Sequence, residues 1–260
     1  MLPLYIVDAF AARPFEGNPA AVCPLEHWID VRTLQAIAAE NALSETAFFV
    51  RRPDGDFDLR WFTPTTEVEL CGHATLASGY VVLQWLDRAR HVVTFHTRSG
   101  ALVVERERER LTLSLPTRTP RAFDAPRELR AALGCPAVEW LRGLYTIAVL
   151  ENERAVRAAR PDLTSIDELS ITARGDDCDF VSRFFAPALG VPEDPVTGSA
   201  HCSLAPYWAG ALGKSHLSAR QVSRRGGQLA CEVRGEHVRL SGTCALYARG
   251  AIELDPPLAP

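Results

Sequence analysis

The sequence lacks the features that mark several large classes of protein. None of its seven cysteines forms a Cys-x-x-Cys pair, and an odd number of scattered cysteines argues against a disulfide framework or a zinc site. No apolar run approaches the roughly 18 residues that a membrane-spanning helix needs. The N-terminus has no basic segment, and Asp8 interrupts its apolar stretch, so no export signal is visible. We therefore expect a cytoplasmic protein with reduced thiols and no membrane association.

The sequence also lacks a strong excess of either charge. Its 28 basic and 32 acidic residues leave a formal net charge of −4, which gives nucleic acid no electrostatic reason to bind. Of the 260 residues, 47% are apolar and 23% are charged, as in a globular protein with a sizeable core. Neither a dinucleotide-binding fingerprint nor a metal-ligand spacing is present. We therefore expect no nucleic-acid partner, and the sequence shows no sign of a dinucleotide or a zinc site.

The chain resembles itself along its length, which predicts two lobes of similar structure. Three blocks recur in the same order and at nearly constant separation. They pair Arg60–Pro64 with Arg183–Pro187, Gly72–Thr75 with Gly198–His201, and Gly100–Ser114 with Gly227–Ser241. We place the lobes at residues 1–117 and 118–260, with residues 246–260 as a candidate for returning to the N-terminal lobe.

Each half carries one helical segment that is apolar on every face. Residues 72–86 and residues 198–212 have this pattern, which is typical of a helix enclosed by other elements. Pro206 is expected to kink the second helix or to end its first part. Residues 30–41 and 126–133 predict amphipathic outer helices, and the rest of each half is rich in strand patterns. The pattern predicts an α+β fold in which a curved, mostly antiparallel sheet wraps around a central apolar helix, twice.

Both apolar helices begin at a glycine. Gly72 and Gly198 leave the first backbone N–H groups and the positive end of a helix dipole open to a ligand, and such an end binds carboxylate or phosphate. If the lobes are related by a pseudo-twofold axis, the two helix starts can face one cleft. The pair predicts a site for a small acid.

Glu45 is an acid embedded in apolar sequence, between Ala42-Leu43 and Ala47–Val50. Burial there would raise the pKa of its carboxyl group toward the range useful for proton transfer. The local pattern equally fits an exposed acid at a strand entry, or one that caps the backbone. From the pattern alone, both interpretations stay open.

Five motifs together resemble the phenazine-biosynthesis PhzF-like family. They are Phe15–Val22, Asn41–Phe49, Trp61–Pro64, Glu69–Thr75 and Glu193–His201, in the order that the family has them. The resemblance implies the diaminopimelate epimerase-like fold of two similar lobes. It also implies a homodimer and an isomerase that needs neither a metal nor an organic cofactor.

The resemblance assigns roles to particular residues. It implies that Glu45 is the single acid/base, and that His73 and Asp194 hold polar groups of the substrate or assist proton transfer. The backbone at Gly72 and Gly198 and the side chain of Ser199 would bind a small carboxylate-bearing substrate. Asn18 is a further candidate substrate contact. The reaction implied is the movement of a carbon-bound proton within one molecule.

Two other functions stay open at this point. One is an amino-acid racemase or epimerase that uses Cys71, which directly precedes Gly72 as the first thiol of related racemases does. No cysteine stands at the corresponding position of the second half, which disfavours a two-thiol mechanism. The other is a small-acid-binding protein that has the site without catalysis. Neither the substrate nor a role in phenazine synthesis follows from the sequence.

Overall fold

The computed structural model describes residues 1–254, and contacts between Cα atoms divide the chain into two compact units. The first unit comprises residues 1–113 and the segment that begins at Gly242, and the second comprises Ser114–Ser241. Strand β18 (Cys244–Ile252) pairs with β1 (Leu2–Ala9) in the first unit. The predicted lobes of 1–117 and 118–260 stay a prediction. The part of the candidate returning segment at 255–260 lies outside the described residues.

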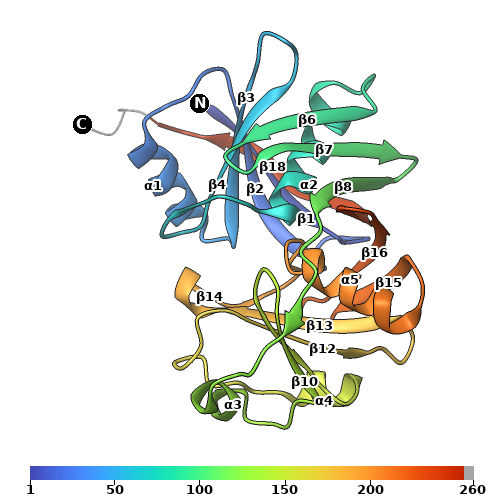
Figure 1. Cartoon of the computed structure of the whole chain (residues 1–260). Helices are drawn as coiled ribbons and strands as arrows, with labels where there is room; N and C mark the ends of the chain where they lie inside the picture. Colours follow the sequence, from blue (N-terminus) through green and yellow to red (C-terminus); the bar gives the residue numbers. More distant parts are fainter. Residues whose placement is uncertain (255–260) are drawn as a thin grey trace. The chain divides into compact units, whose positions relative to one another are not determined.

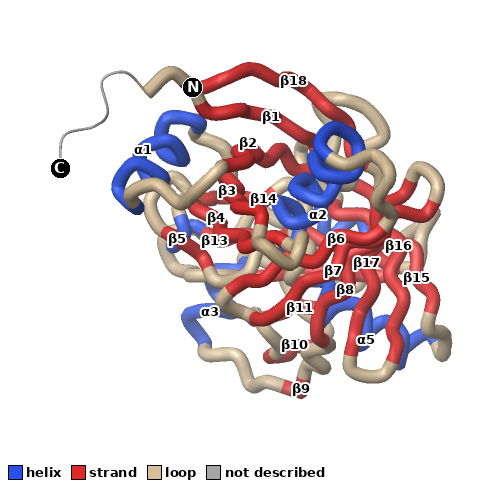
Figure 2. The backbone as a smooth tube through the Cα atoms, turned by 90° about the horizontal axis from the view of Figure 1, so that it is seen from above, coloured by secondary structure: helices blue, strands red, loops and turns tan. Residues whose placement is uncertain are grey.

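A mixed sheet forms the frame of the first unit. Strand β1 pairs antiparallel with both β18 and β2, and Figure 2 shows these three strands side by side. Strands β2 and β3 run parallel, as do β4 and β6, while β3–β4 and β6–β7 are antiparallel. The remaining strands are β2 (Asn18–Leu25), β3 (Glu45–Arg51), β4 (Phe57–Phe62), β5 (Glu67–Val68), β6 (Val92–Thr97), β7 (Gly100–Glu107) and β8 (Arg110–Pro116).

Helix α2 (Gly72–Val81) is the core of the first unit, and a π-helical turn, η1 (Val82–Leu86), extends it. Every residue of α2 except Tyr80 is buried, and the helix contacts β1, β2, β3, β7 and β18 (Figure 1). A helix with no polar face stabilises the fold only if all of its faces leave water. The predicted central helix over residues 72–86 is therefore confirmed.

Helix α1 (Val31–Asn41) lies outside the sheet and shows the expected amphipathic pattern. The Asp30 side chain accepts a hydrogen bond from the Thr33 amide, which caps the helix. Leu34, Ile37 and Ala38 are buried in a cluster that includes Phe48 and Phe62 of the sheet. The helix predicted over 30–41 is confirmed, as is the shorter one at α3 (Arg127–Leu133), which ends at Gly134 in the left-handed conformation.

The second unit is also a mixed sheet with helices. The pairs β10–β11, β12–β13, β15–β16 and β16–β17 are antiparallel, whereas β11–β12 and β13–β15 are parallel. Its strands are β9 (Arg121–Ala122), β10 (Glu139–Arg142), β11 (Thr146–Val149), β12 (Leu169–Arg174), β13 (Phe180–Ala186), β14 (Val191–Asp194), β15 (His216–Gln221), β16 (Gly227–Arg234) and β17 (His237–Gly242). The helices besides α3 are α4 (Glu153–Ala158), the 3₁₀ turn η2 (Pro187–Leu189) and α5 (His201–Leu212).

The apolar helix of the second unit begins later than predicted and continues through Pro206. It starts as a tighter turn, because the amides of His201, Cys202 and Ser203 each bond to the carbonyl three residues earlier, and α5 proper begins at His201 rather than at Gly198. It also runs through Pro206 without ending there. Proline has no N–H that could donate to the Cys202 carbonyl. That carbonyl instead accepts a hydrogen bond of 2.9 Å from the Arg118 amide.

Corresponding ion pairs support the proposed repeat. Arg60 binds Glu67 through two hydrogen bonds of 2.7 and 2.8 Å, and its guanidinium lies over the ring of Phe62. Arg183, at the aligned position, binds Glu193 at 2.6 and 3.0 Å, and its guanidinium lies over Phe185. The order of strand pairing also matches, β2-β3-β4-β6-β7 in one unit and β11-β12-β13-β15-β16 in the other. The internal repeat stays a prediction that these matches favour.

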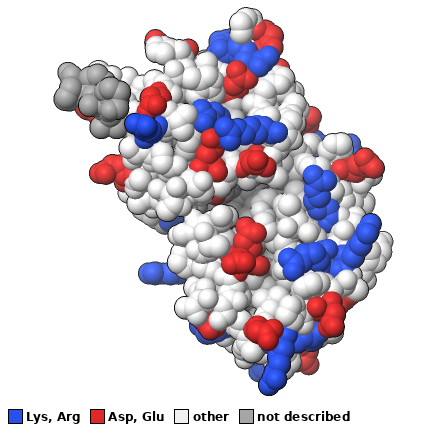
Figure 3. Space-filling view, turned by 60° about the vertical axis from the view of Figure 1, so that its left-hand side comes forward, with Lys and Arg blue, Asp and Glu red and all other residues white. Residues whose placement is uncertain are grey.

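The distribution of surface charge and the length of the helices are relevant to the expectation of no nucleic-acid and no membrane partner. Acidic and basic side chains are interspersed over the face in Figure 3. Within residues 1–254, every helix is too short or too polar to cross a bilayer. The expected location and the expected homodimer stay predictions.

Gly79 and Gly210 provide a matched test of how tightly the central helix is packed. A Cβ at Gly79 would lie 2.6 and 2.8 Å from the Cγ1 and Cβ of Val104, a stiff side chain on β7, whereas a Cβ at exposed Gly210 in α5 would meet nothing within 4 Å. We expect Gly79→Ala to lower the free energy of unfolding by about 1–3 kcal/mol through overpacking. Gly210→Ala should raise it by up to about 1 kcal/mol, because alanine is the better helix former. Urea titrations measure both, and equal effects of the two variants would contradict the packing described.

Candidate active site

The first unit brings Asn18 and Glu45 to one edge of its sheet. Asn18 is the first residue of β2 and Glu45 is the first residue of β3, and these strands are parallel with Ala20 opposite Glu45. Parallel neighbours start at the same edge, so two side chains that are distant in sequence become neighbours. Before β3, Ala42 ends α1 with a φ of +50°, and Asn41 donates a hydrogen bond to Thr46 Oγ1 at 3.1 Å. This turn fixes where β3, and hence Glu45, begins.

Helix α2 brings His73 to the same place. His73 Nε2 lies 3.2 Å from Glu45 Oε2, and its Nδ1 lies 3.1 Å from Asn18 Nδ2 and 3.5 Å from Cys71 Sγ. The exposed fraction is 3% for the His73 side chain and 16% for that of Glu45, so Glu45 is the more exposed of the two, although its Oε2 is buried. Of the two interpretations left open for Glu45, the contact with His73 favours a functional acid over an exposed one.

Burial controls the charge of the imidazole. Removal from water lowers the pKa of His73 to about 3, from an ordinary value of 6.5, because the charged form loses its hydration. His73 is therefore neutral at physiological pH, with one ring nitrogen that donates and one that accepts. A neutral donor beside Glu45 can orient the carboxylate without holding it as a fixed ion pair.

The turn before Asn18 is tightly constrained. Gly17 has a φ of +64°, and a Cβ there would lie 2.1 Å from the carbonyl oxygen of Ala9, so only glycine fits. Phe15 also has a positive φ, of +77°, and its amide donates to Oδ2 of buried Asp8 at 2.9 Å. Positive φ at a phenylalanine is a strained conformation that the surrounding hydrogen bonds must maintain. The Phe15–Val22 motif thus has a structural meaning, because it fixes the start of β2.

Two groups of side chains have the donor types that metal ions use. Glu45, Cys71 and His73 each offer one ligand atom within 4.8 Å of the others, and thiolate, imidazole and carboxylate are all ligands of zinc. Asp54, Asp56 and His96 form a more exposed second group, in which His96 Nε2 lies 3.0 Å from Asp56 Oδ2. The expectation that the protein uses no metal stays a prediction.

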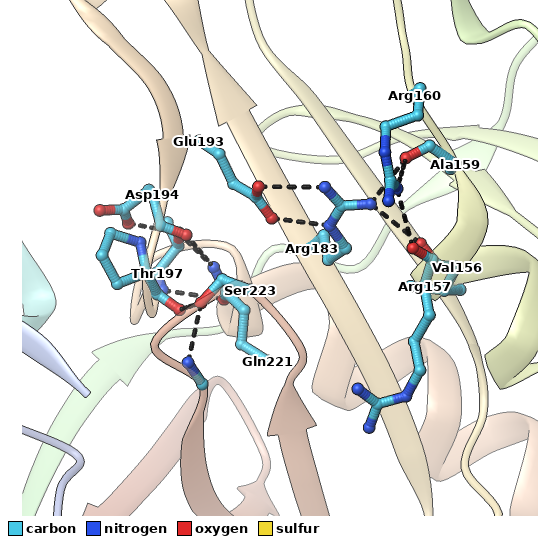
Figure 4. A network of polar contacts seen from close by, with 12 residues as sticks. Val156, Arg157, Ala159, Arg160, Arg183, Glu193, Asp194, Thr197, Gln221 and Ser223 are labelled. Carbon is cyan, nitrogen blue, oxygen red and sulfur yellow. Dashed lines mark hydrogen bonds and ion pairs between the residues drawn. The ribbon is translucent and has the colours of Figure 1, made fainter. Parts of the chain in front are cut away.

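The second unit has its own polar cluster at the end of β14 (Figure 4). Buried Asp194 accepts a hydrogen bond of 2.5 Å from the Thr197 hydroxyl. Gln221 donates from Nε2 to the Asp194 carbonyl at 2.7 Å and accepts the Thr197 amide at 2.9 Å, while Ser223 donates to the Pro195 carbonyl at 2.8 Å. Hydrogen bonds from Gln221, the last residue of β15, and from Ser223, which follows it, thereby hold the Asp194–Thr197 turn.

Arg183 binds the residue that directly precedes the same turn. It donates twice to Glu193, and its remaining nitrogen donates to the Val156 and Ala159 carbonyls at the end of α4 (Figure 4). Sequence reasoning did not select Arg183 or Gln221 as site residues. The repeat aligned Arg183 with Arg60 and could have indicated it, whereas a glutamine at the end of a strand gave no signal.

Ser199 and His201 occupy the turn that leads into α5. Ser199 Oγ lies 3.0 Å from the hydroxyl of Tyr145, and both Ser199 and Gly198 are buried. His201 is fully buried, with Nδ1 at 2.8 Å from the Thr197 carbonyl, so this nitrogen carries the proton. Burial lowers the pKa of His201 to about 4, although the bond to Thr197 opposes that shift. Its Nδ1 stabilises the turn, while its Nε2 is buried without a hydrogen-bond partner among the described residues.

The predicted site residues thus fall into two groups. Asn18, Glu45, Gly72 and His73 lie together in the first unit, and Asp194, Gly198 and Ser199 lie together in the second. The expectation that both groups bind one substrate stays a prediction.

Comparisons with known proteins identify what the chain is similar to. The sequence profile of the family described as "Phenazine biosynthesis-like protein" matches residues 7–250. A Pseudomonas aeruginosa protein named "uncharacterized isomerase" is 52% identical over 258 residues, covering 97% of this chain and 99% of that relative. The crystal structure of a PhzF-family protein from Enterococcus faecalis shares 44% identity with a TM-score of 0.93, covering 97% of this chain and 99% of the other. These matches confirm the family resemblance and the α+β fold expected from the five motifs.

A more distant structure shares the fold alone. A hydroxyproline epimerase from Agrobacterium vitis, solved with trans-4-hydroxy-L-proline, has a TM-score of 0.63 at 12% identity and covers 99% of this chain and 94% of its own. Its chemistry is not transferred by this likeness.

The neutral state of buried His73 makes the stability of the protein depend on pH. Because the folded pKa is about 3 and the unfolded value is 6.5, the unfolded state binds more protons between these values, and acid destabilises the fold. From pH 7 to pH 5 the wild type should lose about 2 kcal/mol more unfolding free energy than His73→Gln, which has no such proton.

Urea titrations at both pH values measure this difference. His237→Gln, at an exposed position on β17, is the matched control and should follow the wild-type pH dependence. Parallel curves for the wild type and His73→Gln would contradict a buried, neutral His73.

Proposed function

The chain belongs to the phenazine biosynthesis-like family and is an isomerase. On this premise we propose that it moves a carbon-bound proton within a small carboxylate-bearing substrate, with Glu45 as the single acid/base. The observation that supports this most strongly is the Glu45 carboxylate, 3.2 Å from the neutral ring of His73 at the first turn of a buried helix. The reaction needs one group that removes a proton and returns it, and Glu45 supplies that group.

The start of α2 provides a binding place for the substrate carboxylate. Gly72 and His73 open a helix of 10 residues, and the first amides of a helix have no partner inside it. These amides and the positive end of the helix dipole attract an anion, and glycine allows it to come close to the backbone. A substrate bound there has its carbon atoms near Glu45, because His73 contacts that carboxylate directly.

The proton then moves in two steps. Glu45 Oε takes a proton from a substrate carbon, and the C–H electron pair enters the conjugated system adjoining that carbon. The helix amides stabilise the negative charge that develops. Glu45 returns a proton to a different carbon and is again a carboxylate, and because its side chain is 16% exposed, the proton that it carries can exchange with solvent before it is returned. His73 Nε2, 3.2 Å from Glu45 Oε2 in the structure, is placed to donate to the carboxylate after a small turn of either side chain and to orient it between the two positions.

The second cluster has a proposed role that comes from the family motif. Asp194 is assigned to proton-transfer assistance or to holding a polar group, and Gly198 with Ser199 to substrate binding. The Thr197 hydroxyl donates to the Asp194 carboxylate, and Gln221 Nε2 donates to the backbone carbonyl of Asp194. These two hydrogen bonds support a preorganised carboxylate. The identity of the substrate, and any place in phenazine synthesis, lies beyond this proposal.

Glu45→Gln tests the acid/base directly. Glutamine keeps the size and polarity of the side chain but cannot accept a proton from carbon, so turnover should fall by at least about 10²–10⁴-fold. The assay follows incorporation of solvent deuterium at carbon, by NMR, across a panel of small cyclic carboxylic acids and amino acids. Compounds for the panel are those that raise the melting temperature of the wild type.

Binding and folding are checked separately in this test. Glu45→Gln should keep the thermal stabilisation by the active compound, which at a hundredfold excess over Kd corresponds to about 2.7 kcal/mol. Glu40→Gln, at an exposed position in α1, is the matched control and should keep full exchange. Wild-type-like exchange in Glu45→Gln would remove Glu45 from the mechanism. Binding without exchange in the wild type would favour the non-catalytic alternative.

A racemase that uses Cys71 is the second candidate, because its sulfur lies 3.5 Å from His73 and so belongs to the same cluster. Such a mechanism needs a second acid/base, and Thr197 stands at the position of the second unit that aligns with Cys71. Cys202, in α5, is a poor substitute, since burial raises the pKa of its thiol to about 12. The geometry therefore favours Glu45.

Cys71→Ala separates the two candidates. If Glu45 is the acid/base, the variant should retain deuterium exchange within about tenfold of the wild type, because the thiol transfers no proton. Cys202→Ala is the matched control for loss of a buried thiol next to a helix start. Loss of exchange in Cys71→Ala alone, together with loss on thiol alkylation that substrate prevents, would establish the racemase instead.

A further inference from the structure

The side chain of Asn18 takes part in a buried chain of contacts that ends at the proposed acid/base. Asn18 is 0% exposed, and its Nδ2 lies 3.1 Å from His73 Nδ1. On the other side of the ring, His73 Nε2 lies 3.2 Å from Glu45 Oε2. The imidazole therefore has a polar neighbour at each nitrogen. Because a neutral ring carries one proton, the neighbour that decides the protonation of Nδ1 also decides that of Nε2.

The hydrogen-bonding chemistry of the three groups fixes the direction of this chain. An amide nitrogen donates and does not accept, so His73 Nδ1 must be the accepting nitrogen. In a neutral imidazole the proton then sits on Nε2, the nitrogen that lies 3.2 Å from Glu45 Oε2 in a close contact that is not aligned as a hydrogen bond. Burial, which keeps this ring neutral, excludes a second proton. If the amide were reversed, Nδ1 would donate to Oδ1, and Nε2 would need a proton from Glu45.

We propose that Asn18 is a positioning residue that selects the Nε2–H tautomer of His73 and thereby keeps Glu45 an oriented carboxylate. This inference rests on the proposed function for its catalytic meaning. It revises the sequence-based view of Asn18 as a substrate contact, because the residue acts through His73. Orientation of the acid/base is what makes proton removal from carbon efficient.

The backbone around Asn18 is built to hold one orientation. Gly17 places the turn where only glycine fits, and the Asp8 carboxylate holds the Phe15 amide. Asn18 itself pairs with Ala9 across the β1–β2 ladder. Cys71 Sγ also approaches Nδ1, but a thiol is a weak donor and a weak acceptor, so the amide decides the tautomer.

Nitrogen-15 NMR of the imidazole rings reads the tautomer without any substrate. In protein labelled at histidine, the His73 signals are those that His73→Gln lacks. We expect an unprotonated Nδ1 and a protonated Nε2 at neutral pH. Asn18→Asp has nearly the same shape but can only accept at neutral pH, so it should move the proton of His73 to Nδ1 or add a second one.

The kinetic consequence is measured on the compound that shows exchange. Asn18→Asp should lower kcat by about 10²-fold with KM within about threefold, because the acid/base is misoriented while binding persists. Asn152→Asp is the matched control. It makes the same change of charge at the cap of α4 in the second unit, where the side-chain oxygen still accepts the Ala155 amide. It should leave the His73 signals and kcat unchanged.

The outcomes separate this inference from the proposed function. An Nδ1–H tautomer in the wild type, or an unchanged His73 signal in Asn18→Asp, would overturn the positioning role whatever Glu45 does. A rise in KM with constant kcat would overturn it in favour of a substrate contact. If Glu45→Gln keeps its exchange while the wild-type ring is Nε2–H and responds to Asn18→Asp, the proposed function fails and the control of the tautomer by Asn18 stands.

Discussion

The fold of the first unit depends on removing every face of α2 from water. A helix without a polar side has no stable position at the surface, so β1, β2, β3, β7 and β18 must surround it. That enclosure has a chemical consequence at the one end where the helix begins. His73 is buried with the helix and stays neutral, and the strand starts that enclose it supply Asn18 and Glu45. The packing that buries the start of α2 therefore also places Asn18, Glu45 and His73 together.

The elements that the sequence predicted well are those decided by local pattern. Asp30 caps α1, Gly134 ends α3, and the all-round apolar pattern of residues 72–86 corresponds to α2 and η1. Each of these follows from side-chain periodicity or from a residue type that suits one backbone conformation. The start of α5 was predicted three residues early, because glycine at position 198 fits a tight turn as well as a helix start.

The parts of the site that the sequence could not provide depend on pairing between distant segments. Glu45 and His73 could be selected from their motifs, but their contact arises from the parallel register of β2 and β3 and from the seat of α2 against them. Asn18 could be placed near the site, yet its bond to Nδ1 requires the amide orientation and the turn at Gly17. Gln221 and Tyr145 gave no local signal, because their roles come from hydrogen bonds to backbone and hydroxyl groups far along the chain.

Pro206 shows that a residue usually regarded as a helix breaker can supply a connection. Any other residue at this position would present an amide that competes for the Cys202 carbonyl, which is the usual partner four residues back. With proline, that carbonyl is left to Arg118, at the entrance to the second unit. The segment that enters this unit is thus hydrogen-bonded to its apolar helix. The amide protons of this segment and of the helix should therefore exchange with solvent in one cooperative opening.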